Sequence, residues 1–157
     1  MVMVSIICSK NYKINKQASS EVLRTLPEWF GIEQSTQAYI ESACIVPCLI
    51  AYDNDEIIGF LSIIESNDFL EIDAMGVKPI YHKRGVGRQL INNLIEYARV
   101  NNYLGIIVKT LSDKHPDINY KLTRLFYHLL GFVDKRELLI WGEELPCIEM
   151  ELLIDEK

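Results

Sequence analysis

Residues 81–90 read YHKRGVGRQL, and this stretch separates an extended apolar run from a run with helical spacing. Two glycines, Gly85 and Gly87, stand among basic residues where the second run begins. The first backbone N–H groups of a helix have no partner within the helix, and glycine lets an anion approach them closely. The stretch therefore predicts a diphosphate site at the start of a helix. The alternative is a tight turn whose basic side chains are only solvated.

The charges around these glycines support an anion-binding role. The whole chain has a formal net charge of -6, yet residues 74–95 contain no Asp or Glu. The basic side chains of that segment are those of Lys78, Lys83, Arg84 and Arg88. A phosphate at the start of a helix is stabilised by the helix dipole and by such cations. Because nucleic-acid binding needs a broad basic surface, the acidic total predicts no nucleic-acid partner.

Length and composition indicate one domain over residues 1–157. No apolar run approaches the roughly 20 residues that a membrane helix needs, so we expect no membrane partner. Residues 1–13 lack the basic start and the small-residue cleavage pattern of an export signal, which predicts a cytoplasmic protein. The cysteines lie in apolar segments without a His cluster, which predicts buried thiols and no metal site. They are Cys8, Cys44, Cys48 and Cys147.

Hydrophobic periodicity divides the chain into helix-like and strand-like segments. Helices are expected at 15–24, 33–43, 85–100 and 119–130, with Asn15 as the N-cap of the first. Strands are expected at 1–8, 46–52, 57–65, 69–77, 104–108, 132–140 and 147–154. Residues 53–56, DNDE, have turn chemistry and predict an antiparallel hairpin. Because the helix at 85–100 joins two strands as a parallel crossover, we expect an α+β fold with a mixed sheet.

Two well-known phosphate-binding loops do not fit this stretch. A Walker loop needs Lys and then Ser or Thr after its last glycine, whereas Gly87 is followed by Arg88 and Gln89. The dinucleotide fingerprint needs a small residue where Leu90 stands. It also needs an acid at the end of the next strand, where the chain has Lys109. Both mismatches disfavour a nucleotide-binding domain.

Two other motifs resemble the signatures of the GNAT superfamily of N-acyltransferases. Residues 75–79 and 81–87, MGVKP and YHKRGVG, are similar to its acetyl-CoA-binding strand and loop. Residues 126–132, FYHLLGF, look like its second signature, a Tyr before a Gly-Phe pair. The resemblance spans nearly the whole chain. It implies the GNAT acyl-CoA N-acyltransferase fold, an α/β three-layer arrangement with a mixed, mostly antiparallel sheet flanked by helices. It also implies acetyl-CoA as the acyl donor.

The same resemblance implies which residues bind the coenzyme. They are Met75, Val77, His82, Lys83, Arg84, Gly85, Val86, Gly87, Arg88 and Tyr120. The backbone N–H of Met75 would polarise the thioester carbonyl, and the backbone of Val77 would pair with pantetheine. His82 stands where Gln or Arg is usual, and Tyr120 stands where many members have an Asn that touches the coenzyme. Because the loop acts mostly through backbone N–H groups, we expect diphosphate binding to tolerate His82.

The strand expected at 69–77 carries two carboxylates. Strand alternation places Leu70, Ile72 and Ala74 on one face and Glu71, Asp73 and Met75 on the other. Ionised carboxylates on such a face must meet water or cations, or line a cleft. In the resemblance, Glu71 matches a position that often supplies the general base, and Asp73 lies toward the acceptor pocket. The residues leave open which of the two acts as the base.

The chemistry of acetyl transfer needs a base and an acid. An alkyl amine has a pKa near about 10.4, so it attacks a thioester only after it loses a proton. The like charge of Asp73 is expected to raise the pKa of Glu71 toward a useful value. The resemblance implies that Tyr127 protonates the leaving thiolate. These roles imply direct attack in a ternary complex, without a covalent intermediate.

The acceptor is expected to be a small-molecule or peptide amine. Trp29 and Phe30 border the acceptor site in the resemblance and could flank an ammonium by cation–π attraction, or they could pack in the core. A homodimer is a further expectation at the level of the family. The alternative function is a non-catalytic acyl-CoA-binding sensor or regulatory module, which would keep the glycine loop without needing Glu71 or Tyr127.

Overall fold

A seven-stranded mixed sheet runs through residues 3–155, the part of the chain that the structure, a computed structural model, describes. The strand order is β1-β2-β3-β4-β5-β7-β6, and only β4 and β5 pair in parallel. The strands are β1 (Val4–Ser9), β2 (Cys48–Asp53), β3 (Glu56–Ser66), β4 (Phe69–Val77), β5 (Gly105–Leu111), β6 (Val133–Leu138) and β7 (Cys147–Leu153). This topology confirms the mixed, mostly antiparallel sheet.

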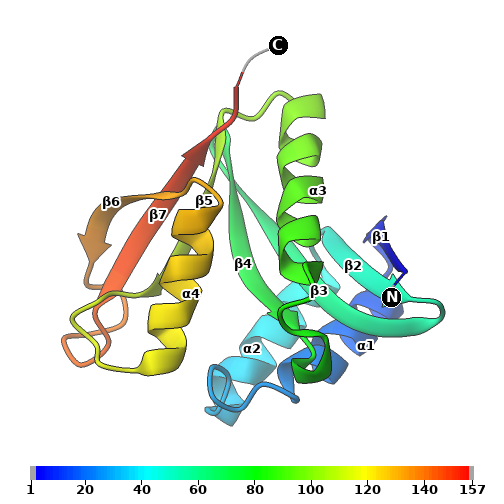
Figure 1. Cartoon of the computed structure of the whole chain (residues 1–157), viewed down its shortest axis with the longest axis horizontal. Coiled ribbons are helices and arrows are strands. Elements are labelled where there is room, and N and C mark those ends of the chain that lie inside the picture. Colours follow the sequence, from blue (N-terminus) through cyan, green and yellow to red (C-terminus); the bar gives the residue numbers. More distant parts are fainter. Residues whose placement is uncertain (1–2, 156–157) are drawn as a thin grey trace.

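Helices cover both faces of this sheet (Figure 1). They are α1 (Tyr12–Leu23), α2 (Glu33–Cys44), α3 (Val86–Val100) and α4 (Ile118–Leu129), with a short 3-10 turn η1 (Pro79–Tyr81) before α3. One core cluster packs α3 and Tyr127 of α4 against the sheet, and the other packs α1 and α2 against the opposite face. The predicted three-layer arrangement is therefore confirmed. In residues 3–155, no helix is long and apolar enough to span a membrane.

The course of β4 changes at a β-bulge. Ile72 pairs with Ile63 and Ala74 pairs with Ser62, so Asp73 has no opposite residue on β3. An extra residue of this kind bends the strand and shifts its side-chain alternation. Leu70 and Ile72 accordingly pack in the α3 core, whereas Ala74 packs in the α1–α2 core.

The bulge makes part of the predicted face assignment of β4 wrong. Met75 packs against the α3 core, away from the face that carries Glu71, and Ala74 lies on the face opposite Leu70. A Cβ at Gly76 would lie 2.7 Å from Leu26 Cδ1, so this glycine also faces the α1 layer. Strict alternation could not anticipate the change because a bulge depends on pairing with another strand.

Two further sequence predictions need correction. The N-cap of α1 is Asn11, whose side chain accepts from the Ile14 N–H, and not Asn15. Asn15 is fully buried, and its amide donates to the carbonyls of Ser9, Ala43 and Val46. Asn15 therefore ties α1 to neighbouring elements rather than starting the helix.

The cysteine prediction fails at one position. Cys44, Cys48 and Cys147 are buried as expected, but Cys8 is exposed. It lies on β1, an edge strand of the sheet whose residues are mostly exposed or half-buried. An edge strand has a neighbour on one side only, so the apolar character of its sequence does not guarantee burial.

A buried hydroxyl satisfies the backbone at the bulge. The Ser62 side chain accepts from the Ala74 N–H at 3.1 Å and lies 3.3 Å from the Ala74 carbonyl oxygen, to which it can donate. Ser62 is fully buried, so no water replaces these contacts. The hydroxyl thus takes the place of a strand partner where the regular ladder is broken.

We expect Ser62→Ala to destabilise the fold by about 1–3 kcal/mol, because it leaves the buried Ala74 N–H without an acceptor. The matched control is Ser66→Ala at the end of the same strand, which should change the free energy of unfolding by less than about 0.5 kcal/mol. Urea denaturation of the three chains measures both values. Equal stability of the two variants would contradict the role given to Ser62.

Candidate active site

The parallel strands β4 and β5 separate to form a fork, which Figure 1 shows as two diverging arrows. Their pairing ends at Ile72 and Val108, although β4 continues to Val77 and β5 continues to Leu111. The bulged residue Asp73 comes directly after the last paired position. The bend at the bulge therefore coincides with the point where the fork opens.

The open side of β4 presents unpaired backbone groups to the fork. The N–H groups of Ala74 and Lys78 point toward β3, where they donate to Ser62 Oγ and to the Ile58 carbonyl. Successive residues of a strand direct their N–H groups to opposite sides. Met75 and Val77 therefore direct theirs into the fork, as their predicted roles require. The Val77 carbonyl oxygen lies 2.6 Å from His82 Nε2, so this histidine already engages one of the groups predicted to pair with pantetheine.

The glycine loop has the backbone shape of an anion site. Lys83 has φ 62° and Gly85 has φ 81°, both in the left-handed region. Gly85 is the N-cap of α3 and, within the described chain, no side chain caps this helix end. A Cβ at Gly85 would meet no atom within 4 Å, so the start of the helix is open. Such a turn directs successive N–H groups outward to bind an anion.

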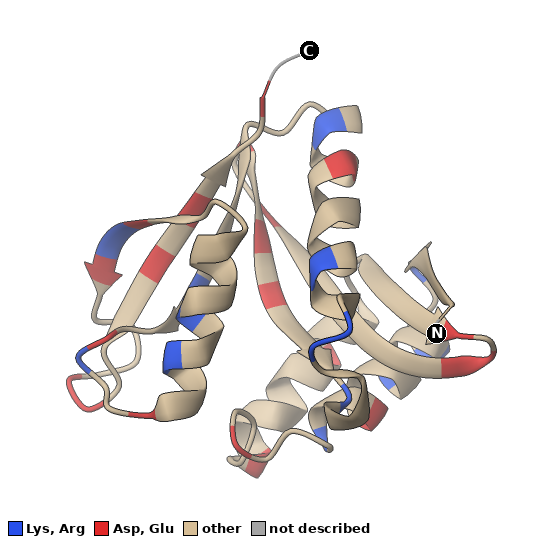
Figure 2. Ribbon diagram, in the orientation of Figure 1, with Lys and Arg blue, Asp and Glu red and all other residues tan. Residues whose placement is uncertain are grey.

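Most of the predicted loop residues surround this open turn. His82, Lys83, Arg84 and Arg88 are exposed, and the guanidinium of Arg84 lies 5.7 Å from the centre of the Tyr81 ring. Val86 is buried in the α3 core, so only its backbone can face a ligand. Figure 2 shows basic positions along the loop before α3 and acidic positions on β4.

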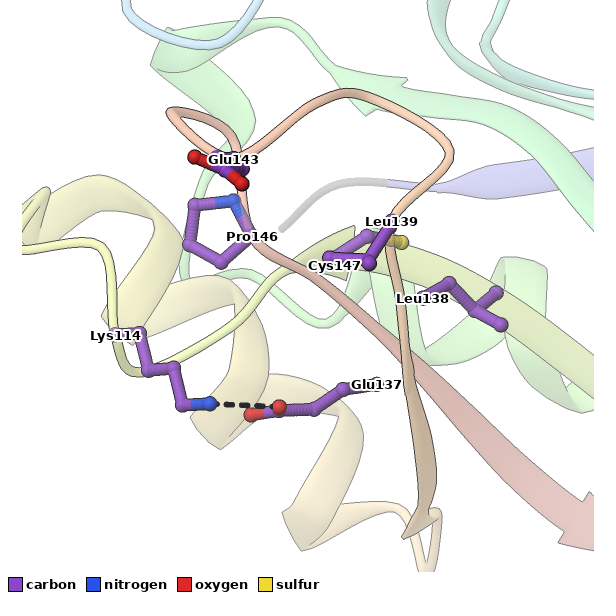
Figure 3. Close-up of a pocket in the computed structure, with 7 residues that line it drawn as sticks. All are labelled: Lys114, Glu137, Leu138, Leu139, Glu143, Pro146 and Cys147. Carbon is purple, nitrogen blue, oxygen red and sulfur yellow. Dashed lines mark hydrogen bonds and ion pairs between the residues drawn. The ribbon is translucent and has the colours of Figure 1, made fainter.

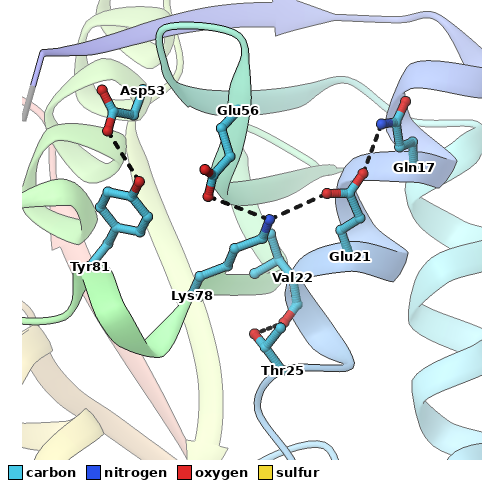
Figure 4. Close-up of polar contacts among 8 residues, drawn as sticks. All are labelled: Gln17, Glu21, Val22, Thr25, Asp53, Glu56, Lys78 and Tyr81. Carbon is cyan, nitrogen blue, oxygen red and sulfur yellow. Dashed lines mark hydrogen bonds and ion pairs between the residues drawn. The ribbon is translucent and has the colours of Figure 1, made fainter.

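Lys78 does not belong to this basic group. Its ammonium lies 3.3 Å from Glu21 and 3.9 Å from Glu56, with its side chain mostly buried (Figure 4). Tyr81, on the other side of the same view, donates to Asp53. These contacts hold the segment that leads from β4 to the loop. The expectation that Lys78 adds to the local anion attraction is therefore wrong, because acidic residues distant in sequence neutralise it.

Tyr127 lies in the core beneath the fork. Its side chain is 5% exposed, and its hydroxyl lies 3.9 Å from Met75 Sδ. Burial raises the pKa of the Tyr127 phenol, so the phenol keeps its proton at neutral pH. Its ring meets those of Phe126 and Phe132 edge-on. Gly131, with φ 100°, follows the end of α4, as the Gly-Phe pair predicted.

Aromatic side chains connect the two arms of the fork. Trp29 Nε1 lies 3.0 Å from the Thr123 hydroxyl and donates to it, and the Tyr120 hydroxyl donates to the Trp29 carbonyl at 3.0 Å. The Trp29 ring also meets His82 edge-on. Tyr120 and Trp29 thus bind the segment before α2 to α4, beside the glycine loop. Phe30 contacts Tyr39 of α2 instead.

An acidic pocket lies on the α2 side of the fork. Its volume is about 140 Å³, and it is lined by Tyr39, Glu71, Ile72, Asp73, Lys109, Ile140 and Trp141. Glu71 and Asp73 thus line one pocket, as the strand pattern predicted. Trp29 and Phe30 are not among its lining residues. Lys109 Nζ lies 3.1 Å from Glu71 Oε1, and the two side chains are 27% and 17% exposed.

The two carboxyl groups of this pocket differ in their surroundings. Burial raises the pKa of Asp73; the Ser42 hydroxyl opposes this change, the Glu71 charge adds to it and Lys109 opposes it. One oxygen of Asp73 is buried without a hydrogen-bond partner among the described residues. The sequence argument expected a like charge to raise the pKa of Glu71, whereas the structure shows a raised pKa at Asp73, with burial as the main cause.

A second pocket has a larger volume but contains none of the predicted site residues. It measures about 170 Å³ and lies beside the β6–β7 connection (Figure 3). Lys114 and Glu137 form an ion pair of 2.7 Å at its wall. Because neither the fork nor the glycine loop contributes to it, we place the candidate active site at the smaller pocket.

Sequence reasoning missed Tyr39, Lys109 and Trp141 as lining residues of the acidic pocket. They come from α2, β5 and the β6–β7 connection, and no local motif marks them. The register of β4 and β5 gives a signal for Lys109, because it directly follows Val108, the last residue of β5 that pairs with β4. That register is known only once the sheet is assembled.

Comparison with known proteins identifies the family of this fold and site. The family model described as the acetyltransferase (GNAT) family matches residues 12–132. The chain therefore belongs to the GNAT acetyltransferase family, as its two motifs predicted. A search of curated protein sequences finds no match.

Solved structures share the fold over the full length of the chain. A GNAT-family protein of Desulfovibrio desulfuricans has a TM-score of 0.81 at 16% identity, covering 98% of this chain and 100% of its own. The ribosomal-protein-S18-alanine N-acetyltransferase of Escherichia coli has a TM-score of 0.75 at 16% identity, covering 99% and 96%. An aminoglycoside 6'-N-acetyltransferase complexed with coenzyme A has a TM-score of 0.71 at 21% identity, covering 99% and 98%.

The raised pKa of Asp73 makes a prediction about stability and pH. The folded chain holds this proton more tightly than the unfolded chain, where Asp titrates near about 3.9. Stability is therefore lost as the pH rises from that value through the folded pKa. We expect Asp73→Asn to melt at a higher temperature than the unmodified chain at neutral pH, and this difference to vanish below about pH 4.

Thermal denaturation at several pH values measures this difference. The matched control is Asp113→Asn, because Asp113 is exposed and lies outside the pocket. We expect this control to change the melting temperature little at any pH. A lower melting temperature for Asp73→Asn at neutral pH would contradict the prediction.

Proposed function

We propose that this chain transfers an acetyl group from acetyl-CoA to a primary amine, by direct attack in a ternary complex. The observation that carries the proposal is the fork between β4 and β5. The open basic turn of Gly85 adjoins the β4 side of the fork, and the pocket of Glu71 and Asp73 lies at its apex. A coenzyme bound through its diphosphate would thus be aimed at an acidic pocket.

The residues present fit coenzyme A. The exposed N–H groups at the start of α3 suit the diphosphate, and Lys83 and Arg88 form no ion pair within residues 3–155. The N–H groups of Met75 and Val77 point into the fork, where they can pair with the pantetheine arm and polarise the acetyl carbonyl. The aminoglycoside acetyltransferase of similar fold was solved with coenzyme A, which supports this assignment.

Glu71 serves as the general base in this proposal. A base must lie about 2.6–3.2 Å from the atom whose proton it takes, directly or through one water. Glu71 already holds an amine nitrogen, that of Lys109, at 3.1 Å. Asp73, which lines the same pocket, contributes negative charge that attracts the acceptor ammonium. As the amine attacks, its proton passes to Glu71 and the bond between the acetyl carbon and sulfur breaks.

Tyr127 serves as the proton donor to the leaving thiolate. A thiol has a pKa of about 8.5, so thiolate departure is helped by a nearby acid. Burial keeps the Tyr127 phenol protonated, and its one polar contact among the described residues is the Met75 thioether. The phenol is therefore free to donate to a sulfur atom that lies near Met75.

The pocket favours a small amine as the acceptor. Its volume of about 140 Å³ holds an aminoalkyl arm more readily than a bulky group. Tyr39 and Trp141 supply aromatic walls beside the two carboxylates, an arrangement that attracts an alkylammonium. The relatives of similar fold include one named for an aminoglycoside and one named for a ribosomal-protein alanine. Both kinds of acceptor belong in the test.

The test is thiol release from acetyl-CoA in the presence of a library of small amines and peptides. Release that depends on both the chain and an amine supports the proposal. Binding of acetyl-CoA without transfer to any amine would instead favour the acyl-CoA sensor. Isothermal titration with coenzyme A measures that binding independently of turnover.

We expect Glu71→Gln to lower kcat by about 10²-fold, because the amide cannot take the proton of the acceptor. Coenzyme A affinity should stay the same, since the glycine loop is distant in the fold from this side chain. The matched control is Glu137→Gln, which also breaks an ion pair with a lysine but lies outside the pocket. Unchanged turnover in Glu71→Gln would transfer the base role to Asp73.

We expect Tyr127→Phe to lower kcat by about 10²-fold while leaving the melting temperature nearly unchanged. The hydroxyl makes only a long contact to Met75 Sδ, so its removal costs the fold little. Steady-state kinetics and thermal denaturation measure the two effects separately. A large loss of stability together with normal kcat would show a structural role instead.

A further inference from the structure

Lys109 occupies the apex of the fork. It directly follows Val108, the last residue of β5 that pairs with β4, and its side chain lines the acidic pocket. Its Nζ is 3.1 Å from Glu71 Oε1. Lys109 thus places a primary amine beside the proposed base, in the pocket proposed for the acceptor.

We propose that Lys109 is a modification site, at which the chain acetylates its own side chain in cis. This inference rests on the proposed function, because it uses the same donor and the same base. It adds a second acceptor, one that belongs to the protein. The bound position of an acceptor amine is thereby occupied by Lys109 until an external amine displaces it.

The geometry separates Lys109 from the other ion-paired lysines of the described chain. Lys78 pairs with Glu21 and Glu56, and Lys114 pairs with Glu137. Lys135 pairs with Glu151. None of these lysines lines the acidic pocket. Lys109 alone combines a base at hydrogen-bond distance with a place at the fork.

The modification is chemically balanced. The Lys109 ammonium gives a proton to the Glu71 carboxylate, and the nitrogen lone pair then attacks the carbonyl carbon of the acetyl thioester. The bond between that carbon and sulfur breaks, and its electron pair leaves with the sulfur. The sulfur takes a proton from Tyr127 or from water. The products are an acetylated lysine and the free thiol of coenzyme A, so no oxidant or reductant is needed.

The product would change the charge of the pocket. An amide carries no charge, so acetylation removes the ion pair with Glu71 and leaves two carboxyl groups without a lysine cation beside them. Glu71 is then available to an external ammonium. The modification thus alters the same pocket that binds the acceptor.

The test uses the purified full-length chain and acetyl-CoA with a deuterated acetyl group, so that acetylation acquired during expression is not counted. Peptide mass spectrometry measures the labelled fraction at each lysine over time. The internal control is Lys114, whose side chain is 64% exposed against 27% for Lys109. Uncatalysed acetylation would favour Lys114, whereas the proposal requires faster labelling at Lys109.

Variants separate catalysis from simple reactivity. We expect Glu71→Gln to slow labelling of Lys109 by about 10²-fold, and Glu137→Gln to leave it unchanged. We expect Lys109→Arg to show no rapid labelling, because arginine keeps the positive charge but has no reactive amine. The rate at Lys109 should also be independent of protein concentration, since the reaction occurs within one chain.

Several results would overturn the inference. They are labelling of Lys109 no faster than that of Lys114, a rate that rises with protein concentration, or full labelling in Glu71→Gln. Transfer to external amines without labelling of Lys109 would overturn the inference and leave the proposed function intact. Binding of acetyl-CoA with transfer to neither acceptor would overturn both.

Discussion

The bulge at Asp73 is the constraint on which the candidate site depends. It removes one residue of β4 from register with β3, and it comes where β4 and β5 stop pairing. If the two strands stayed paired to their ends, the N–H groups of Met75 and Val77 would be used within the sheet. The fork would then offer no backbone partner to a ligand. The buried hydroxyl of Ser62 makes this break in the ladder tolerable.

The fork also separates two regions of opposite charge. The loop before α3 presents exposed cations around an uncapped helix start, while the pocket next to α2 holds two carboxylates. A donor with an anionic coenzyme and an acceptor with a cationic amine would therefore be drawn to different ends of one opening. Lys109, at the apex, is the cation that balances the acidic end in the ligand-free chain. Trp29 and Tyr120 connect the two arms beside this opening.

The sequence predicted most helices and strands and the glycine loop, because these depend on neighbouring residues. Its errors are informative. Lys78 looked like part of a basic segment, but its ammonium contacts Glu21 and Glu56 from distant elements. Asn15 looked like a helix cap, but three carbonyls surround its amide in the core. In both cases a residue whose local setting allowed one role was given another by partners far along the chain.

The amino-acid sequence by itself determined the family, the order of elements and the anion-binding turn. These follow from periodicity, from glycines whose backbone adopts left-handed angles, and from motifs of a few consecutive residues. Only the tertiary structure decided that Asp73 is the carboxyl with the raised pKa, that Met75 lies on the face opposite Glu71, and that Lys109 reaches Glu71. Burial, bulges and ion pairs of this kind arise from contacts between strands and helices far apart in the chain, which local patterns do not contain.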